Sequence, residues 1–284
     1  MKRHLVLATV LVLAIGASPA PAPGGGPVHS DNMQLVDTIT WDDAHRAADG
    51  RTVDTQGGTD VEFASIPVAT TAERGNGQGR GNGGTRSEGR GRDRGPELRD
   101  YAFAGTYRNG LQVVDITDPT DARLVATYDC RIMQGDVQVF EHPTAGWLAT
   151  YTADSGYRQN ESRCHTDADI GAAQVGSFLI DVNDPTNPVA IGFVPFAGGS
   201  HNQTVHPAGT HLYNSRSDRV GVIEVADITD LDDVRFTSLD IGLNDSHDIT
   251  FNADGSRAYS AALNHTVIID TSNPSAPSVV ADIV

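Results

Sequence analysis

The sequence predicts an all-β fold made of four copies of one four-stranded unit. Three observations support this prediction: a short motif occurs four times, the later copies follow one another at a steady spacing, and apolar and polar residues alternate within each copy. A chain of 284 residues is long enough to bury a sizeable core.

The first strand of each copy begins at a shared polar position. Four segments align in register: "GTDVEF" (58–63), "GDVQVF" (135–140), "SHNQTV" (200–205) and "SHDITF" (246–251). The shared column holds Asp60, Asp136, Asn202 and Asp248, and apolar and polar residues alternate after it. Such a period of two is typical of a strand with two different faces.

The second, third and fourth strands follow in the same order in every copy. We expect second strands at 98–105, 147–153, 211–217 and 257–263. The third strands and their turns are "LQVVDITDPTDARLV", "SFLIDVNDPTNPVAI", "VGVIEVADITDLDDV" and "HTVIIDTSNPSAPSV", which align Asp115, Asp181, Glu224 and Asp270 as strand-end and turn residues. With this alignment the third copy departs from the "D-x-x-x-P" pattern of the others. The fourth strands are "ARLVATY", "PVAIGFV", "VRFTSLD" and "PSVVADI".

The spacing of the copies selects one architecture among the all-β folds. Asn202 and Asp248 lie 46 positions apart, and each interval holds four short strands. This is the period of a β-propeller blade, whereas a β-sandwich would not explain the same motif at a fixed spacing. The sequence thus predicts a β-propeller of four-stranded blades, with about four blades present.

The third and fourth strands also resemble a known repeat family. "LQVVDITDPTDARLVATY" and "FLIDVNDPTNPVAIGFV" are similar to the LVIVD repeat, and "HPAGTHLYNS" and "NADGSRAYS" resemble a turn shared with YVTN-like propellers. The resemblance covers residues 34–284 apart from two insertions, and it implies an exported propeller. It implies little about function, because propellers host many unrelated activities.

The N-terminus predicts export. Lys2 and Arg3 precede an apolar run from Leu5 to Ile15 and then small residues, the pattern of a signal peptide over 1–22. Residues 23–33 are expected to form a flexible segment before the repeats of 34–284. We therefore expect a secreted, extracellular protein with no membrane span.

Two insertions interrupt the repeats. A Gly- and Arg-rich segment over 71–96 has almost nothing to bury, so it is expected to be disordered. The second insertion holds Cys164, and Cys130 lies in the loop before the second copy. Blade topology places both loops on one face, so an exported protein is expected to join these cysteines in a disulfide, contributing about 3 kcal/mol.

The start of the first strands is the candidate site. His201 and His247 directly precede the polar column in the third and fourth copies. Together with Asp248 and Asp136 they could bind a divalent metal ion at one mouth of the channel. His206, His165, Asp167 and Asp169 are further candidates near that mouth. The alternative is structural, because an Asp or Asn that opens a strand commonly caps a turn and satisfies backbone N–H groups.

Two function classes stay open. The first is a binding scaffold that presents loops on one face to a protein or carbohydrate partner. The second is a metal-dependent enzyme, an oxidoreductase or hydrolase with a His-lined site, although the chain contains no GxSxG, HExxH, P-loop or dinucleotide motif. The net charge of -17 argues against nucleic acid as a partner.

The sequence does not fix the number of blades in the complete ring. The segment "QLVDTI" (34–39) is similar to the fourth strands, yet the last copy already has a fourth strand of its own. We therefore expect an arc of an incomplete ring, whose exposed edge would favour aggregation or pairing.

Overall fold

The computed structural model describes the following residues: 29–30, 33–39, 57–68, 96–107, 109–130, 132, 135–153, 162–171, 174–197, 199–215, 221–242, 245–262 and 264–284. The expected signal peptide and almost all of the expected disordered insertion lie outside these residues. The chain divides into two compact units, Met1–Thr38 and Ile39–Val284.

The described part of the first unit contains one small ribbon. Strand β1 (His29–Ser30) pairs antiparallel with β2 (Met33–Gln34), with His29 opposite Gln34. No strand is assigned to residues 35–39, where Leu35 and Val36 are exposed. Of the segment that resembles a fourth strand, only Gln34 therefore lies in a strand.

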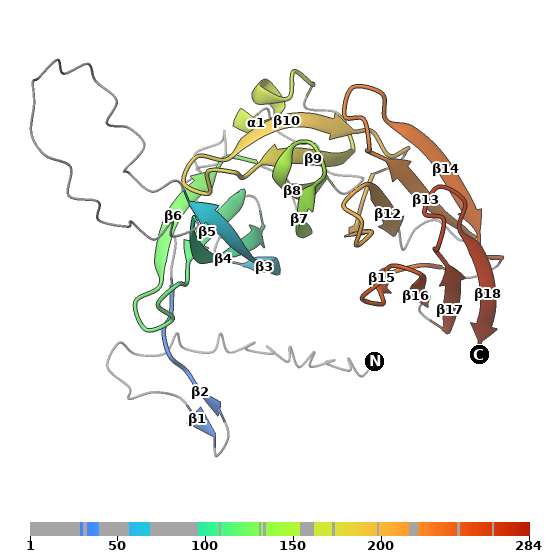
Figure 1. The fold of residues 1–284 in the computed structure, drawn as a ribbon, viewed down its shortest axis with the longest axis horizontal. Coiled ribbons are helices and arrows are strands. Elements are labelled where there is room, and N and C mark those ends of the chain that lie inside the picture. The colour runs from blue at the N-terminus through green and yellow to red at the C-terminus, as the bar shows by residue number, and fades with distance from the viewer. Residues whose placement is uncertain are drawn as a thin grey trace, which may run out of the picture. The chain divides into compact units, whose positions relative to one another are not determined.

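Within its described residues, the second unit contains four antiparallel sheets of four strands each, as the sequence predicts (Figure 1). We call each sheet a blade and number the blades in chain order. In every blade the strands pair with their sequence neighbours, from the first strand to the fourth.

The strands of the first two blades have the following bounds: β3 (Gly58–Val68), β4 (Glu97–Thr106), β5 (Leu111–Asp115) and β6 (Arg123–Tyr128), then β7 (Val137–His142), β8 (Gly146–Ala153), β9 (Gly176–Asp181) and β10 (Val189–Val194). A short helix, α1 (Arg163–Asp167), lies in the connection between β8 and β9.

The last two blades continue the pattern with strands β11 (Asn202–Val205), β12 (His211–Ser215), β13 (Val222–Asp227) and β14 (Arg235–Asp240), then β15 (Asp248–Phe251), β16 (Arg257–Ala262), β17 (His265–Asp270) and β18 (Ser278–Ile283). These bounds agree with the strands expected from the sequence.

The core lies between neighbouring blades. Strand β9 illustrates this, because Phe178 and Ile180 pack in the cluster shared with the first blade, whereas Leu179 packs in the cluster shared with the third. The third and fourth blades share another cluster, which includes Tyr213 and Ile249. Alternate residues of one strand therefore serve two different interfaces, which is the physical reason for the period of two.

Close contact between the first two blades depends on a glycine. A Cβ atom on Gly105 would lie 2.0 Å from the carbonyl oxygen of Gly135. The hydroxyl of Thr59 also donates a hydrogen bond of 2.6 Å to this oxygen. Any larger residue at 105 would push β4 of the first blade away from the segment that leads into β7 of the second.

The turn after the third strand has the same hydrogen bond in all four blades, and it corrects one column of the sequence alignment. The carboxylates accept a backbone N–H two residues later in the pairs Asp115–Thr117, Asp181–Asn183, Asp227–Thr229 and Asp270–Ser272. Strand register confirms the equivalence, because Asp227 lies opposite His211 as Asp270 lies opposite Arg257. The residue equivalent to Asp270 is thus Asp227, not Glu224. The third copy keeps the turn and merely has Leu231 where the other three copies have proline.

Candidate functional site

The polar column at the start of the inner strands connects neighbouring blades. Oδ2 of Asp60 accepts the backbone N–H of Val137 at 3.0 Å. Oδ2 of Asp136 accepts the N–H of Gln203, also at 3.0 Å. Each of these partners follows the column residue of the next blade. The column does satisfy backbone N–H groups, but those groups belong to the following blade rather than to a local turn.

The third blade is also connected to the next blade, but here the side chains donate the hydrogen bonds and backbone carbonyl oxygens accept them. The side-chain amide of Asn202 donates to the carbonyl oxygen of His247 at 3.0 Å, and the hydroxyl of Thr204 donates to that of Ile249 at 2.6 Å. Both acceptors lie in or next to β15 of the fourth blade. An amide is needed here because a carboxylate could not donate to a carbonyl oxygen.

The carboxylates of the column influence one another. Burial raises the pKa of Asp136 well above its usual range, and the negative charges of Asp60 and Asp248 raise it further. Burial also raises the pKa of Glu62, again with a contribution from Asp60. Asp136 stays a predicted metal ligand, and its Oδ2 is already engaged with the N–H of Gln203.

The two candidate histidines lie next to each other, as predicted from their equivalent positions. The ring centroids of His201 and His247 are 5.1 Å apart in an edge-to-face arrangement, and both side chains are partly exposed. Within the residues that the structure describes, no group of three or more His, Cys, Asp and Glu side chains is placed to hold a metal ion. The imidazole pair could still contribute two of the ligands that such an ion needs.

The other histidine on the third inner strand has a different role from the one considered in the sequence. His206 is buried, and its Nε2 is hydrogen-bonded to the carbonyl oxygen of Gly255 in the fourth blade at 2.9 Å. His142, the last residue of β7 in the second blade, likewise has its Nε2 2.9 Å from the carbonyl oxygen of Ile228 in the third blade. These imidazoles connect blades and do not lie at the mouth with His201.

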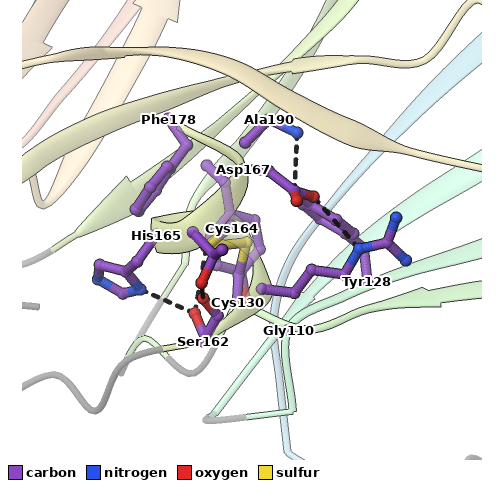
Figure 2. The surroundings of a disulfide bond; sticks show 12 residues. Gly110, Tyr128, Cys130, Ser162, Cys164, His165, Asp167, Phe178 and Ala190 are labelled. Atoms are coloured by element: carbon purple, nitrogen blue, oxygen red, sulfur yellow. Dashed lines mark hydrogen bonds and ion pairs between the residues drawn. A yellow bond between two sulfur atoms is a disulfide. The ribbon is translucent and has the colours of Figure 1, made fainter. Parts of the chain in front are cut away.

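The two cysteines form the predicted disulfide. Cys130 and Cys164 are bonded, and their Cα atoms lie 5.3 Å apart. Cys164 is the second residue of α1, so the bond attaches the insertion between β8 and β9 to the loop that precedes β7 (Figure 2). The insertion is thus held covalently to the connection between the first and second blades.

Polar contacts around the disulfide fix the helix further (Figure 2). The hydroxyl of Tyr128 donates to Asp167 at 2.8 Å and accepts the N–H of Ala190 at 2.7 Å. Nδ1 of His165 lies 2.8 Å from the hydroxyl of Ser162. The His165 ring also packs edge-to-face on Phe178. Asp167 is therefore engaged with Tyr128 of β6, and His165 with Ser162 and Phe178.

Residues of this loop line a small cavity. It has a volume of about 320 Å³ and is lined by His165, Thr166, Asp169, Ile170 and Gly171. Asp169 has a left-handed backbone conformation with φ of 52°, which asparagine and aspartate tolerate best after glycine. Nothing in the sequence pattern marks these residues as a cavity, because the loop lies outside the repeat.

The comparisons with known proteins agree with the repeat architecture. The LVIVD repeat model matches residues 99–130 and 253–283. No curated protein matches the chain. One similar solved structure is a functionally unknown protein from Desulfotomaculum acetoxidans DSM 771, with 15% identity and a TM-score of 0.49 over 64% of this chain and 52% of that one.

A second similar structure is the periplasmic gluconolactonase PpgL of Pseudomonas aeruginosa. It has 13% identity and a TM-score of 0.44, with coverage of 64% of this chain and 53% of that one. The chain thus spans about half the length of these two solved relatives. The chain carries LVIVD repeats, and its four-stranded sheets are blades of the β-propeller type.

Proposed function

We propose that the protein is an exported propeller that acts as a binding scaffold and presents the disulfide-held loop, residues 162–171, to a carbohydrate or protein partner. The observation that carries this proposal is the covalent attachment of the loop: a cavity-bearing insertion is fixed to a rigid sheet. Loops on rigid scaffolds commonly perform recognition. The disulfide and the absence of a helix, among the described residues, that could cross a membrane are both compatible with an extracellular protein.

The roles of the polar residues support binding over catalysis. Asp60, Asp136 and Asn202 are engaged in hydrogen bonds between blades, as are His142 and His206. Of the metal-ligand candidates that the sequence offered, Asp136 and His206 therefore already have structural partners. The solvent-facing polar groups of the disulfide-held loop are better placed to meet a ligand.

Glycan-array binding by the purified secreted protein tests the proposal. Asp169→Asn removes the charge at the cavity and keeps a residue that tolerates the left-handed backbone. We expect glycan binding that Asp169→Asn weakens at least tenfold. The matched control Asp232→Asn, which changes an exposed carboxylate on the turn after β13, should bind as the wild type does. Binding that both variants retain equally would contradict the assignment of the loop.

A metal-dependent enzyme is the second candidate, favoured by the proximity of His201 and His247. It would take a divalent ion with these two imidazoles as its ligands from the described residues. Elemental analysis of protein expressed with metals supplied would support it if a stoichiometric metal is found and is lost in the His201→Ala, His247→Ala double variant. Metal that remains in the double variant would exclude this site.

A further inference from the structure

The fourth blade exposes a face that is covered in the other three blades. Tyr259 on β16 is 39% exposed, whereas the residues at the same position in the earlier blades, Phe103, Thr150 and Tyr213, are fully buried. The same holds for Ile283 on β18. It is 53% exposed, and its equivalents Tyr128, Val194 and Leu239 are at most 7% exposed. In the first three blades this face packs against the next blade.

The first blade exposes the opposite face. Val61 on β3 is 45% exposed, whereas its equivalents Val137, Gln203 and Ile249 are at most 4% exposed under the preceding blade. Phe63, two residues later on the same face, is 63% exposed. The chain thus presents both halves of the contact that its own blades repeat three times.

The polar groups on these faces match the same contact. Asp248 and Thr250 are exposed and occupy the positions from which Asp136 and Thr204 bond to the following blade. Val61 of the first blade is equivalent to Gln203 and Ile249. Its backbone N–H therefore corresponds to the Gln203 N–H that Asp136 accepts, and its carbonyl oxygen to the Ile249 carbonyl oxygen that Thr204 donates to. The hydrogen-bonding groups and the apolar groups of these two faces would therefore both be matched if one blade packed on the other in the orientation seen within the chain.

We propose that the exposed face of the fourth blade binds the exposed face of the first blade in a second copy of this chain. The occupant is a second copy because the exposed face of the first blade has, position by position, the residues that a following blade would place against the fourth blade. Two copies would contribute eight blades, which lies within the ordinary range of about four to eight for closed propellers. The two contacts would be related by a twofold axis, so a head-to-tail contact would close instead of extending into a filament. This inference is independent of the proposed ligand.

Light scattering coupled to size exclusion, performed on the full chain, tests the proposal. The wild type is expected to elute with the mass of two chains. Tyr259→Asp and Phe63→Asp each place a charge in both contacts and should give the mass of one chain. The control Ile191→Asp changes another exposed apolar residue, on β10 of the second blade, and should leave the mass of two chains unchanged. Thermal melts check that all three variants remain folded.

Mixing the variants distinguishes the head-to-tail contact from other pairings. The Tyr259→Asp chain keeps an intact first blade, and the Phe63→Asp chain keeps an intact fourth blade, so an equimolar mixture should restore one contact and form a mixed dimer. A symmetric pairing of fourth blades would instead leave Phe63→Asp dimeric, which would overturn the proposal. A wild type with the mass of one chain at all concentrations would overturn it as well.

Discussion

At the scale of single residues, the column at the start of the inner strands shows how one position combines architecture and electrostatics. Asp136 accepts the N–H of Gln203, yet burial and the charges of Asp60 and Asp248 raise the pKa of its carboxyl well above the usual range. A group whose pKa is higher in the folded than in the unfolded chain stabilises the fold below its unfolded pKa, and this contribution is lost as pH rises. Asp136 should therefore weaken the fold at neutral pH.

Replacement of Asp136 by asparagine tests this electrostatic account. The amide oxygen can still accept from Gln203, and the charge is gone, as it is at Asn202 in the third blade. We expect a higher melting temperature than in the wild type at pH 7, with a difference that shrinks towards about pH 4, near the unfolded pKa of aspartate. Melting curves across this range measure it. A variant that is less stable at pH 7 would show that the carboxylate form is the favoured one.

The histidines should separate into two groups by their effect on stability. His206→Ala removes a buried imidazole that is hydrogen-bonded between blades, so we expect a loss of about 2 kcal/mol in the free energy of unfolding. His247→Ala removes a partly exposed ring and should cost less than about 0.5 kcal/mol. Denaturant unfolding of both variants provides the measurement, and equal losses would contradict the assigned roles.

At the scale of elements, the repeat explains both what the sequence could predict and one error. The alternation within each strand predicted its limits well, because each strand packs against two different neighbours. The aligned column nevertheless placed Glu224 where Asp227 belongs. Both residues are acidic and only three positions apart, so composition could not distinguish them, whereas the strand register and the turn hydrogen bond do. The disulfide-held loop lies outside the repeat. The sequence could predict its disulfide and name His165, Asp167 and Asp169 as candidates, but it could not predict the cavity that the loop lines.

The disulfide should stabilise the second blade by limiting the unfolded chain. Cys130 and Cys164 are 34 residues apart, and closing a loop of this length contributes about 3–4 kcal/mol in the chain-entropy account. We expect the Cys130→Ser, Cys164→Ser double variant to lose this amount in denaturant unfolding. Adding a reductant should destabilise the wild type by a similar amount and leave the double variant unchanged. If the reductant has no effect on the wild type, the bond does not contribute in solution.

At the scale of the whole molecule, equivalent side chains of the inner strands have different surroundings in different blades. They bond to the next blade where one follows in the structure, and they are exposed in the fourth blade. The sequence predicted the repeated polar positions but could not show which groups they would reach, because the partners lie about one blade further along the chain. The central claim is that polar side chains of the inner strands hold neighbouring blades together. The contribution of each such side chain to the free energy of unfolding should therefore depend on whether a neighbouring blade accepts its hydrogen bond, and not on the residue type.

The most direct measurement compares Thr204→Val with Thr250→Val. The two threonines occupy the same position in the third and fourth blades, and only the hydroxyl of Thr204 donates to a following blade within the chain. Both changes are made in the Tyr259→Asp chain, so that association between copies does not contribute. We predict that Thr204→Val lowers the free energy of unfolding by about 1 kcal/mol and that Thr250→Val changes it by less than about 0.5 kcal/mol. Equal losses at the two positions, or a larger loss at Thr250, would contradict the account.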